Sequence, residues 1–412
     1  MKANLNRGNF PKENIKICIS GSKSESNRML ILQAQFPNIS IENLSESDDT
    51  VVLQKGLQTA NGAIDIHHAG TAMRFLTAYF AAKQGSEIIL TGSQRMQERP
   101  IGILVDALRS LGAEIEYIEN ESFPPLKIRG KKLQNDEVKI KADISSQYIS
   151  ALMLVAPMFP EGLKINLEGK TTSIPYIEMT LSLLKSIGIE REFSTNTISI
   201  SSKKNIEKTT LVVESDWSSA SYFYSLVALS EEGFKISLKS FSKESLQGDA
   251  ALVQIYDSLG VQTVFDSSNN TISLSKNKTE LPDSLMLDLS NTPDLAQTIT
   301  VSCFGLGIAC ELTGLHTLKI KETDRLLALK NELEKLGAII QVNDNSLSLE
   351  NSLKIHSNIT IETYQDHRMA MAFAPMALKT NIVIKDAEVV SKSYPNFWED
   401  IQETGISLNF MS

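Results

Sequence analysis

The segment Gly21–Arg28, which reads GSKSESNR, contains the residue types that proteins use to bind anions. Lys23 and Arg28 supply positive charge, and the serines between them supply hydroxyl donors. A helix that begins here also presents unpaired backbone N–H groups, so the segment predicts a site for a phosphate or a carboxylate. It is not a Walker A loop, because Ser22 rather than glycine precedes the lysine. Taken alone, such a segment is more often the capped start of an ordinary helix.

Comparable groups of small, polar and charged residues recur at other predicted helix starts. In the first half of the chain they are Gly70-Thr71-Ala72-Met73-Arg74, Arg95 to Pro100, Ser145-Ser146-Gln147 and Ser173 to Tyr176. In the second half they are Asp294, Lys321 to Arg325, Asp366-His367-Arg368 and Lys392. This recurrence predicts that several segments, distant in sequence, bind anionic groups together.

The composition restricts the kind of protein and the kind of partner. With 412 residues the chain is long enough for two domains, and 42% hydrophobic and 22% charged residues are typical of a globular protein. The net charge of −9 argues against a nucleic-acid partner, because such a partner needs a broad basic surface. Any anionic ligand must therefore be bound by a local concentration of cations.

The cysteines and the apolar segments indicate a cytoplasmic protein without metal or membrane contacts. The cysteines are odd in number and lack metal-ligand spacing, so we expect reduced core residues at Cys18, Cys303 and Cys310. Residues 1–7 contain no apolar stretch, so we expect no signal peptide. The most apolar segments, 151–159 and 295–310, are too short or too interrupted by polar residues to span a bilayer.

Apolar helical patterns that end in glycine recur about every 75 residues. Each glycine suits the position just after a helix, and the patterns end at Gly112, Gly188, Gly260, Gly337 and Gly405. Alternating segments around polar turns follow three of them and predict β-hairpins at 189–200, 261–274 and 339–349. Helix starts repeat with the same period, near Gly70, Ser145, Ser218, Asp294 and Asp366.

This repeat predicts an α/β fold of α+β repeats, with six units of strand, helix, strand, helix and hairpin. The first unit is truncated, because Gly21 lies about 25 residues closer to Gly70 than the period requires. We expect two domains of three units each, 21–213 and 1–20 plus 214–412, with the active site in the cleft between them. Most of the predicted helices are apolar, so each domain should have its helices inside and its sheets outside. A solenoid is the alternative, but its repeats are shorter, roughly 20 to 50 residues.

The chain resembles the 5-enolpyruvylshikimate-3-phosphate (EPSP) synthase family. Motifs typical of that family occur in the family's order along nearly the whole chain: GSKS-x-SNR, AGTAMR, RM-x-ERPI, SSQ, S-x-PYIE, QGD, PD, KETDR, DHRMAMAF and SKSYP-x-F. The resemblance implies transfer of the enolpyruvyl group of phosphoenolpyruvate to the 5-hydroxyl of shikimate 3-phosphate. Phosphate would be released, and no metal or organic cofactor would be used. The reaction belongs to the shikimate pathway of aromatic amino-acid biosynthesis, and we expect a monomer.

The resemblance also assigns roles to individual residues. Those implied to bind shikimate 3-phosphate are Lys23, Ser24, Arg28, Ser145, Ser146, Gln147, Ser173, Asp294 and Lys321. Those implied to bind phosphoenolpyruvate are Lys23, Gly70, Arg99, Gln147, Arg325, Arg368 and Lys392. Asp294 would be the base at the 5-hydroxyl, Glu322 the acid at the vinyl carbon, and Lys23 would stabilise charge on the leaving phosphate. Because each substrate carries a phosphoryl group and a carboxylate, many cations must converge in one place.

Structural roles remain open for several of these residues. Glu322 and Asp324 could form only ion pairs at a helix start, and Asp294 could be only an N-cap. We expect Arg74 and Arg95 to be structural partners.

The chain departs from the family pattern at three positions. His68 replaces the usual Asn before AGTAMR, Thr317 replaces an Asn four residues before Lys321, and Phe75 replaces the common Pro after AGTAMR. We expect His67 and His68 to be consecutive strand residues, which point to opposite faces, so we expect no metal site at this pair. We expect these changes to alter affinity rather than the reaction.

Two other functions compete with this interpretation. The sister carboxyvinyltransferase family, which acts on UDP-N-acetylglucosamine, has a Cys in the loop that here spans 92–99, and this loop contains none. The other is a catalytically silent binding protein that kept the fold. His68 and Thr317 favour it, whereas the presence of Lys23, Asp294 and Glu322 argues against it.

Overall fold

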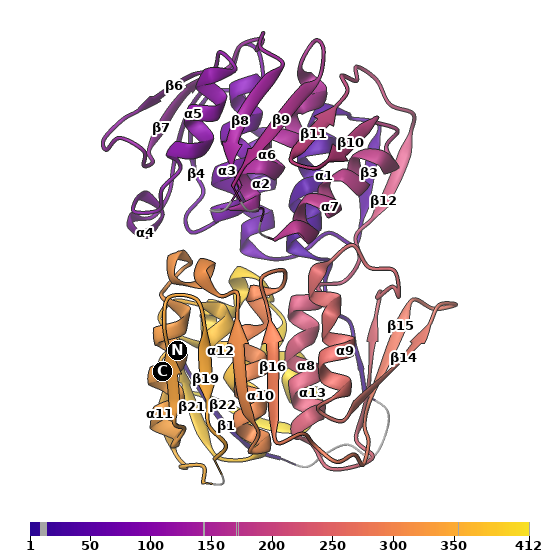
Figure 1. Ribbon diagram of the computed structural model, residues 1–412, viewed down its shortest axis with the longest axis vertical. Coiled ribbons are helices and arrows are strands. Elements are labelled where there is room, and N and C mark those ends of the chain that lie inside the picture. Colours follow the sequence, from indigo (N-terminus) through magenta and orange to yellow (C-terminus); the bar gives the residue numbers. More distant parts are fainter. Residues whose placement is uncertain (9–14, 143–144, 170, 172, 353, 412) are drawn as a thin grey trace. The chain divides into compact units, whose positions relative to one another are not determined.

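The chain folds into two compact units. The computed structural model describes residues 1–8, 15–142, 145–169, 171, 173–352 and 354–411. One unit comprises Gly21–Val213, here called the N-unit, and the other comprises Met1–Ser20 with Glu214–Ser412, here called the C-unit. Figure 1 shows their helices and strands in sequence colours.

The N-unit contains two four-stranded sheets, ordered β4-β5-β7-β6 and β10-β11-β9-β8, and a two-stranded sheet of β3 and β12. Its strands are β3 (Ile39–Glu42), β4 (Gly62–Asp65), β5 (Glu87–Thr91), β6 (Glu114–Tyr117), β7 (Leu126–Arg129), β8 (Glu137–Lys141), β9 (Leu163–Glu168), β10 (Arg191–Ser194), β11 (Thr197–Ile200) and β12 (Thr209–Val212). Its helices are α1 (Lys23–Gln35), α2 (Asp48–Gln58), α3 (Gly70–Ala82), α4 (Gln94–Gln97), α5 (Gly102–Ser110), α6 (Ser146–Val155) and α7 (Ile174–Ser186).

The C-unit contains three four-stranded sheets, ordered β14-β15-β13-β2, β16-β17-β19-β18 and β20-β21-β1-β22. Its strands are β1 (Lys2–Arg7), β2 (Ile15–Ile17), β13 (Lys235–Lys239), β14 (Val261–Asp266), β15 (Thr271–Lys276), β16 (Ser284–Asp288), β17 (Ala309–Thr313), β18 (Ile340–Val342), β19 (Leu347–Leu349), β20 (Ile359–Ile361), β21 (Ile382–Lys385) and β22 (Ile406–Met411). Its α-helices are α8 (Trp217–Leu229), α9 (Leu252–Asp257), α10 (Ala296–Leu306), α11 (Arg325–Leu336), α12 (His367–Phe373) and α13 (Phe397–Glu403).

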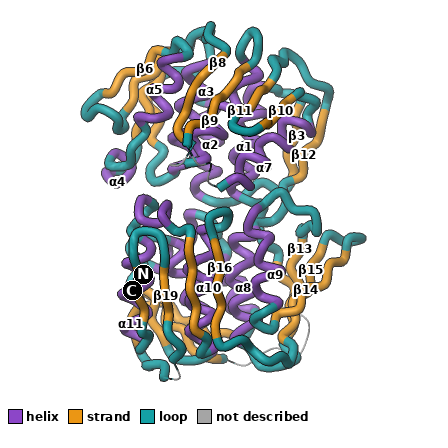
Figure 2. The backbone as a smooth tube through the Cα atoms, in the orientation of Figure 1, coloured by secondary structure: helices purple, strands orange, loops and turns teal. Residues whose placement is uncertain are grey.

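Each unit has its most apolar helices inside and its sheets outside, as the sequence predicts. Residues 70–81 of α3 are all buried, and α8 and α10 are buried almost throughout, so these helices have no solvent face. The strands instead alternate buried and exposed residues, as in β5 and β9, so one face of each sheet is solvated. Figure 2 shows the strands around the helices of each unit.

The predicted repeat is confirmed by its local landmarks. The five glycines that were expected to end helices all have positive φ, from 74° at Gly188 to 103° at Gly337. The three predicted hairpins are the strand pairs β10–β11, β14–β15 and β18–β19. In each four-stranded sheet a parallel strand pair, such as β8 with β9, is extended by antiparallel strands.

The first of the six repeat units, which lies in the N-unit, is truncated, as predicted. Helix α2 ends at Gln58 and β4 begins at Gly62, so this unit has no hairpin of its own. Its strand β3 pairs in parallel with β12 alone. The sequence analysis missed β1, which lies antiparallel between β21 and β22 and joins the two chain ends in one sheet. The predicted placement of His67 and His68 in a strand was also wrong, because both residues follow β4 in a turn, with φ of 49° at His67.

Candidate functional site

Three carboxylates of the C-unit surround the guanidinium of Arg325. Its Nη1 donates to Asp294 Oδ1 at 2.8 Å, its Nη2 to Glu322 Oε2 at 2.8 Å and its Nε to Asp366 Oδ2 at 2.6 Å. Arg368 Nη2 reaches the other oxygen of Asp294 at 3.2 Å. Together with Lys321, whose Nζ lies 3.6 Å from Asp294 Oδ1, these residues form what we call the Arg325 cluster: Asp294, Lys321, Glu322, Arg325, Asp366 and Arg368.

Three helix starts position this cluster. Asp324 caps α11 by accepting from the Leu327 N–H, which places Arg325 in the first turn of that helix. Asp366 caps α12 in the same way by accepting from the Arg368 N–H at 2.9 Å. Asp294 lies in the 3₁₀ turn Pro293–Leu295 that leads into α10, and not at the N-cap considered in the sequence analysis.

The cations hold Asp294 in its ionised form. Burial alone would raise the pKa of this carboxyl, but Arg368, Lys321 and Arg325 outweigh burial and hold the pKa well below its usual range. Arg325 bonds both Asp294 and Glu322 directly. The two carboxyls expected to act as base and acid are therefore held on one guanidinium.

The neighbouring cations respond to the same carboxyls. Burial lowers the pKa of Arg325, but Asp366, Glu322 and Asp294 more than compensate, so its pKa is raised. For Lys321, attraction to Asp294 raises the pKa, while burial and the repulsion of Arg325 together exceed that attraction, so the pKa is lowered. The ammonium of Lys321 is therefore the least firmly charged cation of the Arg325 cluster.

A hydroxyl connects Arg368 to a second buried carboxyl. Arg368 Nη2 lies 3.3 Å from Ser218 Oγ, and this hydroxyl donates a short hydrogen bond to Asp249, the aspartate of the QGD motif. Burial raises the pKa of Asp249 to about 6, and repulsion by Asp294 adds to that effect. The QGD motif contributes to the family resemblance, but no role was predicted for Asp249 from the sequence.

Lys392 is tied to the segment before α12. It ends the 3₁₀ helix Ala387–Lys392, and its Nζ donates to the backbone carbonyl of Gln365 at 2.8 Å. The adjacent residue, Asp366, is the cap that Arg325 contacts. Four of the predicted cations, Lys321, Arg325, Arg368 and Lys392, are thus associated with the same end of the C-unit helices.

In the N-unit, Arg28 is buried in a pocket of hydroxyls and aromatic rings. Its Nε donates to Thr180 Oγ1 at 2.8 Å, and its Nη2 to Ser150 Oγ at 3.0 Å. The rings of Phe75 and Tyr176 lie 5.5 and 5.6 Å from its guanidinium carbon. Burial lowers its pKa to about 10, which leaves it charged at neutral pH. Phe75, a departure from the family pattern, is thus a direct neighbour of a predicted site residue.

The start of α1 places Lys23 and Ser24 beside Arg28. The backbone carbonyl of Ser24 accepts from Arg28 Nη1 at 2.7 Å. Lys23 Nζ lies 3.6 Å from Asp49 Oδ2, and both side chains are largely buried. The sequence analysis missed Asp49, although a pair of aspartates at a predicted helix start could have indicated an acceptor for a nearby lysine.

The start of α3 forms a second part of the N-unit site. A Cβ atom on Gly70 would lie 2.7 Å from Arg99 Nη1 and 2.8 Å from Arg74 Nη1, so any larger residue would displace these guanidinium groups. Arg74 Nη1 donates to the Gly70 carbonyl at 2.8 Å, in agreement with the structural role expected for it. Gln147 Nε2 lies 3.4 Å from Thr71 Oγ1, which links the start of α6 to that of α3.

The remaining predicted residues of the N-unit lie at helix starts. Ser145 caps α6 by accepting from the Gln147 N–H at 3.3 Å, and Ser146 is the first residue of that helix. Ser173 precedes α7 with φ of 53° and is buried. All three hydroxyls therefore lie at helix N-termini, which suit an anion.

The histidine pair and the loop after it behave as ordinary polar groups. His68 Nδ1 lies 2.7 Å from the hydroxyl of Ser93, which caps α4. Arg95 pairs with Glu98 at 3.1 Å on the exposed side of that loop, as expected of a structural partner. Among the described residues, no cluster of three His, Cys, Asp or Glu side chains is arranged to bind a metal. Likewise, no described helix is both long and apolar enough to cross a membrane.

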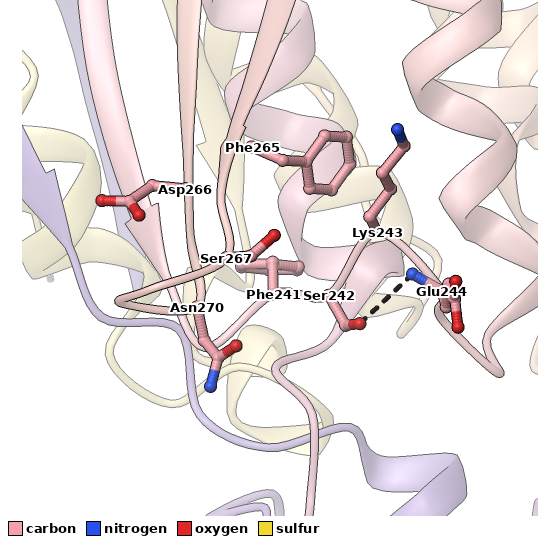
Figure 3. Close-up of a pocket in the computed structure, with 8 residues that line it drawn as sticks. All are labelled: Phe241, Ser242, Lys243, Glu244, Phe265, Asp266, Ser267 and Asn270. Atoms are coloured by element: carbon pink, nitrogen blue, oxygen red, sulfur yellow. Dashed lines mark hydrogen bonds between the residues drawn. The ribbon is translucent and has the colours of Figure 1, made fainter.

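A surface pocket of about 230 Å³ lies elsewhere in the C-unit, at the turn between β14 and β15 (Figure 3). Its lining residues are Phe241, Ser242, Lys243, Glu244, Phe265, Asp266, Ser267 and Asn270. None of them belongs to the predicted site, and Lys243 is the single cation among them. This pocket lacks the convergent cations that two anionic substrates require.

Comparisons with known proteins agree on one family. A family model described as EPSP synthase (3-phosphoshikimate 1-carboxyvinyltransferase) matches residues 36–401. A 3-phosphoshikimate 1-carboxyvinyltransferase of Bacteroides fragilis (strain YCH46) is 44% identical over 396 residues, which is 95% of each chain. One of Sulfurovum sp. (strain NBC37-1) is 34% identical over 418 residues, covering 94% of this chain and 96% of the relative.

A solved structure supports the same fold. An EPSP synthase from Acinetobacter baumannii superposes with a TM-score of 0.78 at 20% identity, covering 99% of this chain and 100% of that chain.

Proposed function

Since this chain belongs to the EPSP synthase family, we propose that its N-unit and C-unit clusters together bind shikimate 3-phosphate and phosphoenolpyruvate and catalyse their reaction. The activity is that of a 3-phosphoshikimate 1-carboxyvinyltransferase, which forms EPSP from the two substrates in the shikimate pathway.

The C-unit would hold phosphoenolpyruvate through Arg325, Arg368 and Lys392. A guanidinium forms two parallel hydrogen bonds with a carboxylate or a phosphoryl group, which suits both ends of this substrate. Arg99, Lys23, Gln147 and the Gly70 backbone would complete the binding site from the N-unit. The close approach of Arg99 to Gly70 supports this assignment, because it places a cation beside the backbone of a residue that has no side chain.

The N-unit would hold shikimate 3-phosphate. Arg28, Lys23 and the hydroxyls of Ser24, Ser145, Ser146 and Ser173 offer charge and donors for its phosphoryl group, with Gln147 lying between the two substrates. The buried serines at the starts of α6 and α7 support this role, because helix N-terminal N–H groups favour phosphate. Lys321 and Asp294 would contact the same substrate from the C-unit.

Asp294 and Glu322 would carry out the proton transfers. Asp294 would take the proton of the 5-hydroxyl as its oxygen attacks the central carbon of phosphoenolpyruvate, and Glu322 would protonate the terminal carbon. A proton then leaves that carbon as phosphate departs, with Lys23 stabilising the charge on the phosphate. Substrate anions would offset the surrounding cations, which would raise the low pKa of Asp294 and make it a more effective base.

The single observation that carries this assignment is that Arg325 bonds both Asp294 and Glu322 at 2.8 Å. The cation proposed to bind phosphoenolpyruvate thus contacts both of the carboxyls proposed to transfer protons. Binding of the substrate would change the charge that both carboxyls experience. This coupling would make the action of the acid and the base depend on the presence of the substrate.

The decisive experiment measures phosphate release by purified protein with phosphoenolpyruvate and shikimate 3-phosphate. UDP-N-acetylglucosamine serves as the alternative acceptor, and Asp294→Asn tests the base. With phosphoenolpyruvate present, we expect phosphate release when shikimate 3-phosphate is the acceptor and none when UDP-N-acetylglucosamine is the acceptor. For the Asp294→Asn variant we expect a loss of about 100-fold or more in kcat. Release with neither acceptor would support a silent binding protein instead, and full activity of Asp294→Asn would exclude this residue as the base.

We further propose a cytoplasmic monomer that uses no metal or organic cofactor. The three cysteines are free thiols, which is consistent with a reducing compartment. Cys303 and Cys310 are buried as expected, but the expectation of a core position was wrong for Cys18, which is exposed just after the end of β2. All groups needed for the proton transfers are side chains of the chain itself. Light scattering at several protein concentrations would test the monomer, and activity after treatment with a chelator would test the absence of a metal.

A further inference from the structure

The segment that leads into α12 contains a tight turn in an unusual conformation. The Asp366 N–H donates to the Thr363 carbonyl at 2.9 Å, and the two residues between them have positive φ, 54° at Tyr364 and 57° at Gln365. Positive φ at both central positions defines a type I′ turn, in which Asn and Gly are the usual residues. Tyr and Gln are strained in this conformation, so other contacts must hold the turn in place.

The buried carboxylate of Glu332 supplies those contacts. Its side chain is 0% exposed, and it projects from α11 toward the turn. Its Oε1 accepts from the Tyr364 hydroxyl at 2.7 Å, and its Oε2 accepts from the Glu362 N–H at 2.9 Å. Lys335 Nζ lies 2.6 Å from the same Oε2 and offsets the charge. Burial and this hydrogen bond raise the pKa of Tyr364 to about 12, so its hydroxyl remains a donor.

The same turn contacts the three C-unit cations of the predicted phosphoenolpyruvate site. The carbonyl of Gln365 accepts from Lys392 Nζ at 2.8 Å. The carboxylate of Asp366 accepts from Arg325 Nε at 2.6 Å and from the Arg368 backbone N–H at 2.9 Å. A change in the turn would therefore move the partner atoms of all three cations at once.

We propose that Glu332 is a positioning residue for phosphoenolpyruvate binding and that it acts through the turn at residues 363–366. This inference rests on the function proposed above. Glu332 does not touch the substrate. It holds Tyr364 and Gln365 in their positive-φ conformations, and these fix the Gln365 carbonyl against Lys392 and the Asp366 carboxylate against Arg325. Glu332 reaches the turn directly through the Tyr364 hydroxyl and the Glu362 N–H, so the turn is its proposed route of action.

Two variants remove this support to different degrees. Glu332→Gln keeps the side-chain volume but weakens the contacts to Tyr364 and Lys335, and Tyr364→Phe removes one hydrogen bond only. Glu334→Gln is the matched control, because Glu334 is a more exposed residue of the same helix whose partner Lys330 lies 3.8 Å away. Steady-state kinetics with each substrate varied in turn gives a separate KM for phosphoenolpyruvate and for shikimate 3-phosphate.

We expect Glu332→Gln to raise the KM for phosphoenolpyruvate about tenfold and Tyr364→Phe about threefold, with the KM for shikimate 3-phosphate within about twofold of wild type. Glu334→Gln should match wild type. A purely structural role for Glu332 would lower the amount of active protein without this difference between substrates. Equal changes in both KM values, or none in either variant, would overturn the proposal.

A rescue variant tests the route. Gln365→Gly removes the strain at one position of the turn and leaves its carbonyl in place, and the Gln365 side chain is exposed. Combined with Glu332→Gln, it should restore at least half of the lost phosphoenolpyruvate affinity. If the combination were no better than Glu332→Gln alone, the turn would not be the route and the proposal would fail. Absence of turnover in the wild type would instead refute the proposed function itself.

Discussion

Replacing Arg325 by alanine should destabilise the C-unit strongly and in a pH-dependent manner. The guanidinium is 2% exposed and bonds three carboxylates at 2.6 to 2.8 Å. Removing it leaves Asp294, Glu322 and Asp366 near one another without their shared partner. Breaking a buried ion pair by removing one partner costs about 3 to 5 kcal/mol, so we expect a loss of about 4 kcal/mol in the free energy of unfolding at pH 7.

The loss should become smaller as the pH falls. In the wild type the folded-state pKa of Asp294 is depressed, so its stabilising contribution is present above the unfolded pKa and is lost only as the pH falls through the folded value. In the variant Asp294 loses one of the cations that depress its pKa, so its folded pKa rises and it takes up a proton at milder acidity. Each unit of pKa corresponds to about 1.4 kcal/mol, and the loss should shrink by about 1 to 2 kcal/mol between pH 7 and pH 5.

Tryptophan fluorescence during urea unfolding is the assay. The chain contains two tryptophans, Trp217 and Trp398, and both are buried in the C-unit, so the signal reports on that unit. With a slope of about 2 kcal/mol/M, a loss of 4 kcal/mol lowers the midpoint by about 2 M. Lys330→Ala, on the exposed side of the same helix, should shift the midpoint by less than about 0.3 M. A loss below about 1 kcal/mol for Arg325→Ala, or one independent of pH, would refute the reasoning.

Three further predictions concern other parts of the chain. Burial raises the folded pKa of Asp249 to about 6, so its stabilising effect is fully present below the unfolded value and is lost as the pH rises through 6. Asp249→Asn should therefore gain up to about 3 kcal/mol relative to wild type between pH 4 and pH 7, measured by the same fluorescence assay, and a constant difference would contradict this. Phe80→Ala should destabilise the N-unit by about 3 to 5 kcal/mol, seen by circular dichroism, because this ring is fully buried; a loss under about 1 kcal/mol would show that the site collapses without a cavity. Ellman's reagent should modify Cys18 alone in the native protein, because Cys303 and Cys310 are buried, and all three thiols after unfolding; rapid reaction of more than one native thiol would be inconsistent with this burial.

Much of the fold follows from local patterns in the sequence. Helix ends depend on nearby residues, so the spacing of glycines and of capping Ser and Asp residues revealed the repeat and its truncated first unit. The structure confirms these glycines by their positive φ and these caps by their hydrogen bonds. Burial of α3 and α8 could be predicted from their apolar composition, because a helix that is apolar all round has no face suited to water. The residues assigned to the site came from motifs in a family order.

The pairings were not accessible in the same way. Strand β1 joins β21 and β22 across the whole length of the chain, and no local pattern specifies that partner. Asp366 meets Arg325 although 41 residues separate them, and Arg28 meets Thr180 across 152. Only packing of the helices brings such groups together.

The sequence by itself thus determined which residue types are available and where helices and strands begin and end, because those features depend on neighbouring residues. The tertiary structure alone decided which carboxylate each cation contacts and which charged side chains become buried. It also decided that Tyr364 and Gln365 adopt positive φ, against their own preferences, because Glu332 on another helix holds them there. Ionisation and strain depend on these long-range contacts, and both vary with distance in space rather than along the chain.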